Sequence, residues 1–270
     1  MTCKSSILKG EKSLSIQRVT SKWAKTKVML KSDYLRSYMP PTKLFGRGSL
    51  QSMLSEYGMV YVKPINGTFG NGVIRVERTT VPALGYRYQL GTKILFFSTL
   101  DQLYHKLAGQ TKKRSYLVQK GIHLLKHQKR RFDIRVMVQK NPHNEWEATG
   151  IIGRLAHPAK IVTNYHSGGT PMALERLMGD HANASELAAF KNKLRKVSIT
   201  IANQLQGAYP NIKELGVDIA IDAKLHPWIL EVNTLPDPFI FRKLPDQNVF
   251  HKVYRYAVAY GRFKKRSSRP

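Results

Sequence analysis

A glycine-rich loop between two strand-like runs is the feature that most constrains this 270-residue chain. Lys63 ends the first run, and the following loop holds Gly67, Gly70 and Gly72 before a second run begins at Val73. Glycine permits positive φ and close backbone approach, so successive N–H groups can point at phosphate oxygens while Lys63 supplies a positive charge. A Walker A loop or a dinucleotide fingerprint would instead open a helix. The pattern predicts a phosphate-covering hairpin, and an ordinary hairpin turn fits the loop alone equally well.

A cluster of acids gives the second constraint. Four of the 17 Asp and Glu residues lie close together in the sequence, namely Asp218, Asp222, Glu231 and Asp237. If residues 223–226 form a four-residue hairpin loop, Asp218 faces Glu231 across the strand pair, and Asn233 shares a face with Glu231. Opposed like charges favour a cation between them, and these oxygen ligands suit Mg²⁺. A one-residue slip would move Asp218 to the other face, and two solvated acids on an exposed hairpin are the alternative.

The overall charge predicts an anionic partner. The chain has 45 Lys and Arg residues against 17 Asp and Glu residues, a formal net charge of +28. This charge suits a nucleotide, an acidic peptide, an anionic polymer, an anionic surface or a nucleic acid, and it does not choose among them. Nucleic acid is the less favoured partner, because neither a zinc-finger pattern nor an RRM-like aromatic signature is present.

Cysteine content and hydropathy point to a cytoplasmic protein. Cys3 is the only cysteine, so neither an intrachain disulfide nor a cysteine-based zinc site can form. Membrane spans need about 18 or more consecutive apolar residues, and the chain has no such stretch. The first residues also lack the apolar segment of a secretory signal.

The spacing of apolar residues predicts an α+β protein. Helices are expected at 21–36, 49–57, 99–108, 186–205 and 246–260. Strands are expected at 59–63, 73–77, 93–97, 115–119, 132–139, 146–155, 216–221 and 228–232. A capping box of Asn183 and Glu186 should open the fourth helix. Because the strands gather in the middle of the chain, a regular βαβ alternation is not expected.

Several motifs occur in a recognisable order: VKPINGTFGNG, LVQKGI, FDIRV, IIGRL with NYHSGGT, GVDIAID and ILEVN. This order resembles the ATP-grasp superfamily and, within it, the YheC/YheD group of endospore coat-associated proteins, over roughly residues 20 to 240. The resemblance implies an ATP-grasp fold, in which two α+β lobes with antiparallel sheets clasp a nucleotide. It divides the chain into an extension at 1–20, an ATP-grasp domain at 21–245, and a C-terminal helix with a basic tail at 246–270. Within the domain, about 59–120 would form the smaller nucleotide-covering lobe and about 121–245 the metal-binding lobe.

The resemblance also implies phosphate contacts. Lys63 would contact the α- and β-phosphates, and residues 67–72 would close over them. Lys22 resembles the earlier nucleotide-binding lysine of the superfamily. Lys25 and Lys27 are close rivals for that role, and a solvated helix face is the alternative.

Two further groups of residues match the family pattern. Gln119 and Lys120 correspond to the strand that hydrogen-bonds the adenine edge, with Ile122 against the ring. Arg135 and Arg154 resemble the strand arginines that face the transferred phosphoryl group or the substrate carboxylate. A guanidinium suits such anions because it can donate two parallel hydrogen bonds.

The remaining matches concern the γ-phosphate and the metal. Asn164 resembles part of a loop that faces the γ-phosphate. Asp218, Glu231 and Asn233 match the metal-binding set, which would hold two Mg²⁺ ions, with Mn²⁺ as an alternative. The ligands implied are therefore ATP and magnesium.

In this superfamily a carboxylate attacks the γ-phosphate, and an amine or other nucleophile then takes the acyl phosphate. The resemblance therefore implies a carboxylate-amine ligase that acts on a carboxylate-bearing or acidic substrate. The alternative is a catalytically silent ATP-binding protein, structural or regulatory, that is associated with the spore coat or an anionic polymer. Many ATP-grasp enzymes have a separate N-terminal subdomain, whereas only about twenty residues precede Lys22. The second-substrate pocket would then be open, incomplete or supplied by a partner.

Overall fold

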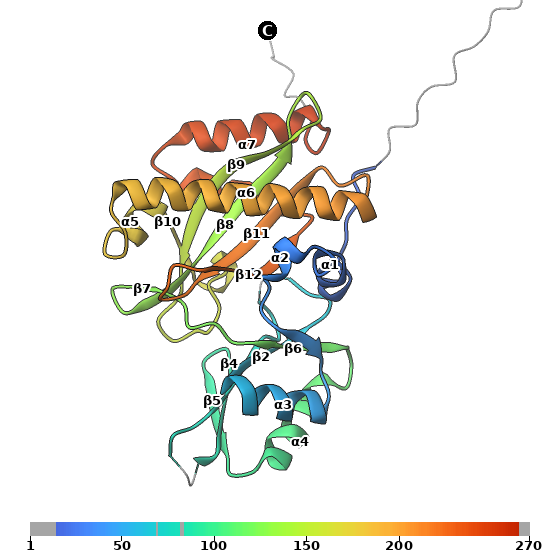
Figure 1. Cartoon of the computed structure of the whole chain (residues 1–270), viewed down its shortest axis with the longest axis vertical. Coiled ribbons are helices and arrows are strands. Elements are labelled where there is room, and N and C mark those ends of the chain that lie inside the picture. Colours follow the sequence, from blue (N-terminus) through green and yellow to red (C-terminus); the bar gives the residue numbers. More distant parts are fainter. Residues whose placement is uncertain (1–14, 69, 82–83, 265–270) are drawn as a thin grey trace, which may run out of the picture.

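An antiparallel sheet of six strands forms the lower lobe in Figure 1 of the computed structural model, which describes residues 15–264 except 69, 82 and 83. Its strand order is β1-β6-β2-β3-β4-β5. The strands are β1 (Thr42–Leu44), β2 (Met59–Pro64), β3 (Ile74–Arg78), β4 (Tyr86–Leu90), β5 (Lys93–Phe97) and β6 (Tyr116–Lys120). Helices α3 (Arg47–Tyr57) and α4 (Leu100–Thr111) cover one face. Val60 and Val62 of β2 join that core, so Tyr61 and Lys63 alternate to the opposite face.

The second sheet forms the upper lobe, in the order β10-β9-β8-β11-β12, and β7 pairs with β8. Its strands are β7 (Lys126–His127), β8 (Arg130–Lys140), β9 (Trp146–Leu155), β10 (Thr170–Met172), β11 (Glu214–Ile221) and β12 (Pro227–Asn233). The 25-residue helix α6 (Ala184–Ala208) packs on one face through side chains spaced three or four apart. Its other face is polar, and none of the helices in the described part of the chain could cross a bilayer.

The opposite face of the second sheet is covered only in part. Helix α7 (Gln247–Ala259) and the 3-10 turn η3 (Phe239–Lys243) pack over Met137 of β8 and Ile152 of β9. Asp133 and Arg135 of β8 share the face of Met137 by the two-residue period of a strand. Met137 packs against α7 and η3, whereas the side chains of Asp133 and Arg135 line the cavities between the lobes. The fold therefore leaves half of this face for a site.

Short elements link the two lobes. Helices α1 (Lys22–Met29) and α2 (Asp33–Arg36) lie between the sheets in Figure 1, and the backbone N–H of Lys22 donates to the carbonyl of Ile65. The 3-10 turn η2 (Tyr165–Ser167) and helix α5 (Leu174–Met178) complete the upper lobe. Residues 17–19 run along the same lobe, where Gln17 N–H donates to the carbonyl of Asn211.

The α+β class is confirmed, and so is the capping box of α6, but other expectations were wrong. The single helix expected at 21–36 is two helices, because the Ser32 hydroxyl accepts from the Leu35 N–H and starts a new helix. Four strands and one helix were not predicted: β1, β4, β7, β10 and α5. All five are five residues or shorter, so sheet pairing and packing decide them more than local periodicity does.

Asp218 pairs with Glu231 in the acidic hairpin, as predicted, but the strand register next to the turn differs from the predicted one. Next to the turn, Ile221 pairs with Pro227, so the loop is one residue longer than predicted. The register then shifts between Asp218 and Ile219, which leaves Leu230 as a bulge. The bulge restores the opposition of the two carboxylates.

Candidate functional site

Two adjoining cavities lie between the lobes. The first has about 700 Å³ of empty space, and both lobes line it, with Lys63, Gln119 and Ile122 on one side and Asp218 and Glu231 on the other. The second has about 1440 Å³. Both are lined by three of the same residues, namely Arg154, Asn164 and Glu231. We call the first the cleft and the second the chamber.

Lys63 is the buried cation of the cleft. Its Nζ donates to Gln119 Oε1 at 2.5 Å and to the carbonyl of Leu230 at 3.0 Å. That carbonyl belongs to the bulge of β12, so the bulge aims it across the cleft at the lysine. Burial lowers the pKa of Lys63 to about 8, although Glu231 opposes the shift. The ammonium is thus held in a dry position without a directly bonded carboxylate.

The segment joining the lobes carries the three residues expected to face adenine. Gln119 is fixed from two sides, since its amide nitrogen also donates to Thr42 Oγ1 at 2.9 Å. The Lys120 ammonium lies 5.1 Å from the ring centroids of both Tyr57 and Trp228. Ile122 is buried and lines the cleft. This end of the cleft, formed by Gln119, Lys120 and Ile122, therefore places an apolar side chain beside polar backbone groups.

Lys22 connects the glycine loop to the acidic hairpin. Its Nζ donates to the Gly67 carbonyl at 2.7 Å and lies 3.3 Å from Glu231 Oε1. The rival Lys25 lies deeper in the protein and bonds the Val19 carbonyl at 2.5 Å. Lys27 is exposed. Of the three lysines, Lys22 is the one that joins the two motifs.

The glycine loop lies against the loop of Asn164. Gly67, Gly70 and Gly72 all have positive φ, and Gly70 also lines the cleft. A Cβ atom at Gly70 would lie 2.9 Å from Asn164 Oδ1, closer than real Cβ contacts allow. Glycine is needed at this position by both its conformation and its close approach.

Two arginines hold two buried carboxylates beside the cleft. Arg154 donates to both oxygens of Asp133, at 2.9 and 2.5 Å, and its Nη2 also lies 3.0 Å from Asp218 Oδ2. Arg135 donates to Asp218 Oδ1 through Nε and to Oδ2 through Nη2 at 3.0 Å. Strand order explains the cluster, because β8 lies between β9 and β11. Gly216 leaves room for Arg135, whose Nη1 would lie 3.1 Å from a Cβ there.

The arginines determine the charge of Asp218. Burial alone would raise the pKa of this carboxyl, but Arg135 and Arg154 outweigh burial and hold its pKa below the ordinary value. The pKa of Arg154 is raised, because Asp133 and Asp218 outweigh its own desolvation. Asp218 and Arg154 are therefore ionised at neutral pH.

Glu231 and Asn233 have the donor chemistry for a divalent cation. Both line the chamber, and the Glu231 side chain is 24% exposed. Mg²⁺ is commonly held by one or two carboxylates together with phosphate oxygens, so this pair fits the ion. Asp218 differs, because guanidinium groups occupy both of its oxygens. Among the described residues, no group of three His, Cys, Asp or Glu side chains is arranged to hold a metal.

Three residues of the site were missed or given no role by the sequence analysis. Asp133 belongs to the FDIRV motif but received no role, although the two-residue period of a strand could have placed it on one face with Arg135. Arg18 lines the chamber but lies in the segment treated as an extension. Leu230 contributes through its carbonyl, which no sequence pattern identifies.

The chain is similar to known proteins over most of its length. Residues 14–263 match the family model of YheC/D-like ATP-grasp proteins. The chain is 26% identical over 226 residues to the endospore coat-associated protein YheD of Bacillus subtilis (strain 168), covering 82% of this chain and 49% of that protein. It is 24% identical over 234 residues to YheC of the same strain, covering 84% and 62%. The chain thus spans about half to three fifths of the length of these relatives.

A solved structure shows the same fold. The D-alanine-D-alanine ligase from Coxiella burnetii superposes with a TM-score of 0.51 and 12% identity, covering 90% of this chain and 57% of that one. At this identity the likeness concerns the fold alone, and it confirms the expected ATP-grasp architecture of two α+β lobes with antiparallel sheets. The family match over nearly the whole chain, joined to this fold, shows that the chain belongs to the YheC/D-like ATP-grasp family.

Proposed function

We propose that this protein binds Mg-ATP in the cleft and uses it to join a carboxylate to an amine through an acyl phosphate. One observation carries the proposal: Lys63 and the acidic hairpin, distant in the sequence, line a single cleft. The Leu230 carbonyl of that hairpin bonds the lysine directly. A glycine loop with positive φ lies over the same space.

The residues around the cleft suit a nucleotide bound in one orientation, with adenine at one end and the triphosphate at the other. Adenine would lie against Ile122, with its polar edge toward the backbone of Gln119 and Lys120. The triphosphate would then extend toward Lys63, Lys22 and the glycine loop. Ammonium groups and loop N–H donors stabilise phosphate charge, and a partly desolvated setting strengthens this stabilisation.

The acid substrate would enter from the chamber. Its carboxylate oxygen would form a bond to the γ-phosphorus while the bond from that phosphorus to the β–γ bridging oxygen breaks and ADP leaves. An amine nitrogen would then attack the acyl carbon and form the amide, while the bond from that carbon to the phosphate oxygen breaks, inorganic phosphate leaves and the nitrogen loses a proton to water. Arg135 and Arg154 would hold the reacting groups with their unused Nη1 donors, and Asn164 would face the γ-phosphate. Mg²⁺ on Glu231 and Asn233 would neutralise charge on the phosphate oxygens.

A second function is favoured by the state of Asp218. Its two oxygens already contact Arg135 and Arg154, so its charge is compensated without a metal cation. A protein that binds ATP without turnover needs no cation at this carboxylate. The matched relatives are named for endospore coat association, and spore association is the localisation that we propose in either case.

The first test measures nucleotide binding. Mg-ATP should raise the thermal midpoint of the wild type, by about 2.7 kcal/mol of stability at a hundredfold excess over Kd. Lys63→Met and Glu231→Gln should lose most of this shift. Lys196→Met removes an exposed positive charge on α6 and should keep it. A wild type that shows no shift would contradict both functions.

The second test separates the two functions. Amino acids, peptides and wall precursors are incubated with Mg-ATP and hydroxylamine, which traps an acyl phosphate as a hydroxamate. Hydroxamate that depends on one added acid would support the ligase. ATP binding without hydroxamate from any acid of the panel would support the silent ATP-binding protein.

A further inference from the structure

More cations than carboxylates line the chamber. Among the described residues that line it, Arg18, Lys25, Arg135 and Arg154 outnumber the carboxylates Glu231 and Asp237. Arg135 and Arg154 are committed to Asp218 and Asp133 beside the cleft.

Lys25 is a buried ammonium with a weak partner. Its residue is 3% exposed, and Nζ bonds one neutral group, the carbonyl of Val19. Within the described part of the chain it forms no ion pair. Burial lowers the pKa of Lys25 to about 8, although Glu231 opposes the shift. A buried charge without a counter-charge is unfavourable unless a ligand supplies the opposite charge.

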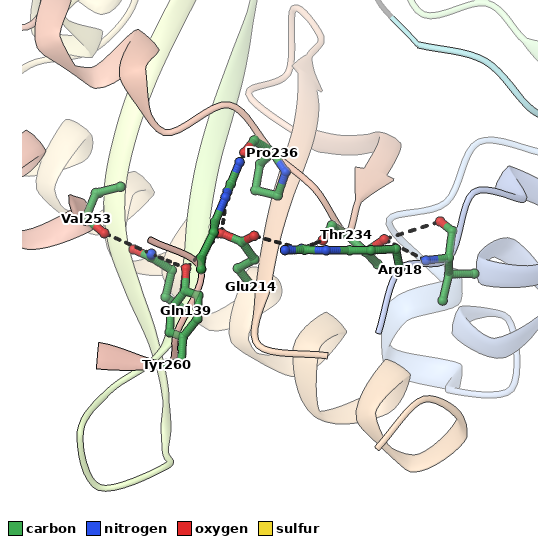
Figure 2. Close-up of polar contacts among 9 residues, drawn as sticks. Arg18, Gln139, Glu214, Thr234, Pro236, Val253 and Tyr260 are labelled. Atoms are coloured by element: carbon green, nitrogen blue, oxygen red, sulfur yellow. Dashed lines mark hydrogen bonds and ion pairs between the residues drawn. The ribbon is translucent and has the colours of Figure 1, made fainter. Parts of the chain in front are cut away.

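Arg18 precedes Val19 in the sequence, and Figure 2 shows its side chain extending toward Glu214 and Thr234. Its Nη1 donates to Glu214 Oε1 at 2.7 Å and to the Thr234 carbonyl. Glu214 is fully buried and is shared with Arg262, whose Nη1 donates to Oε2 at 2.6 Å. Two guanidinium groups therefore share one carboxylate, which leaves one positive charge in excess. Nε and Nη2 of Arg18 bond none of the residues that the structure describes, and its side chain is 25% exposed.

Lys25 and Arg18 lie at different places along the chamber. Glu214, which holds Arg18, lies four residues before Asp218 on β11, or about 13 Å along the strand at about 3.3 Å per residue. Lys25 lies nearer the reacting centre, because it lines a cavity together with Lys63 and Glu231. The cations of the chamber therefore extend from the reacting centre toward Glu214.

We propose that the acid substrate carries a second anionic group, which Lys25 and Arg18 bind in the chamber. This inference rests on the proposed function, because it concerns the acid that the ligase would activate. The substrate class is an acidic peptide or a similar oligomer with more than one carboxylate. Lys25 and Arg18 would thereby select acids with several charges over acids with one.

The experiment compares tri-glutamate with tri-glutamine, which has the same length but lacks the side-chain carboxylates, using both the L and the D peptides. Calorimetry measures their Kd with and without Mg-ADP. Wild type should bind one tri-glutamate enantiomer at least about tenfold more tightly than its amide analogue, as expected for hydrogen bonds to charged groups. Lys25→Met and Arg18→Met should bring this ratio close to one, while Lys25→Arg should keep most of it.

Lys27→Met is the matched control, because Lys27 is exposed on the same helix as Lys25. It lowers the net charge equally, and the binding ratio should not change. Lys25→Met should fold with an unchanged or higher thermal midpoint, since it removes a desolvated charge. A wild type without preference, or a Lys25→Met variant that keeps the preference, would overturn the inference.

The outcome is separable from the proposed function, because Mg-ATP binding is measured on the same samples. Peptide discrimination that is absent while ATP still binds would remove the second-anion subsite and leave the ligase proposal intact. Peptide discrimination without ATP binding would support the second-anion subsite and contradict the ligase proposal.

Discussion

Lys63 is the residue whose environment bears most directly on nucleotide binding. It is buried, and its pKa falls to about 8 because the ammonium is desolvated, with Lys22 adding to the shift and Glu231 and Asp218 opposing it. The unfolded chain keeps the ordinary value of 10.5, so between about pH 8 and 10.5 the unfolded state binds more protons. Burial of Lys63 therefore destabilises the fold below about pH 8, and this penalty is relieved as the pH rises.

The same pKa predicts how ATP affinity depends on pH. Above about pH 8 the free protein loses the Lys63 charge, so the Kd for Mg-ATP should rise from pH 7 to pH 9. Lys63→Arg stays charged throughout this range and should flatten that dependence. Lys25 titrates near the same pH, so the measurement is repeated in Lys25→Met. An equally steep profile in Lys63→Arg would show that another group is responsible.

Among the elements, the glycine loop and the Asn164 loop depend on each other. Gly70 approaches Asn164 and Val162 so closely that a methyl group would lie 2.9 and 3.2 Å from them. The φ of Gly70 is also +75°, which side chains rarely adopt. Local sequence predicted a turn of this type, but the contact comes from the other lobe.

Gly70→Ala should therefore shift the loop and weaken ATP binding by about tenfold or more, with a loss of stability of about 1 kcal/mol. Gly48→Ala serves as the control, since Gly48 lies in helix α3 with open space at its Cβ. That substitution should raise stability by about 0.5–1 kcal/mol and leave ATP affinity unchanged. Titration with a fluorescent ATP analogue and urea unfolding measure the two effects. Gly70→Ala with wild-type affinity would exclude a role for the close approach.

Across the whole molecule, one buried carboxylate ties both ends of the described chain to the chamber (Figure 2). Glu214 holds Arg18 from the N-terminal segment and Arg262 from the residues after α7. These arginines also donate to the carbonyls of Thr234 and Pro236, directly after Asn233. The network thus anchors the chamber wall from two sides.

Glu214→Gln should destabilise the protein by about 3–5 kcal/mol in urea unfolding, because it leaves two desolvated guanidinium groups without a counter-charge. Replacing the triad together, as Arg18→Met, Glu214→Leu and Arg262→Met, should be nearly neutral in stability, since burying ions is costly. Glu175→Gln, at a side chain 59% exposed, should change stability by less than about 0.5 kcal/mol. A strongly destabilised triple variant would mean that the triad itself stabilises the fold.

The sequence by itself determined the local features. Strand and helix periodicity, the capping box of α6 and the glycine loop follow from residues close together in the chain. Family resemblance added the residues that meet at the cleft. Because backbone conformation depends mainly on neighbouring residues, these features could be predicted.

Tertiary structure alone decided how the charges are paired. Asp133, Arg135, Arg154 and Asp218 form one cluster because β8 lies between β9 and β11, an order that no local pattern specifies. The bulge at Leu230, the burial of Lys25 and the anchoring of Arg18 likewise depend on segments far apart in the sequence. Charge pairing follows from distance in space, so the two arginines beside Asp218 could be found only from the packing of strands.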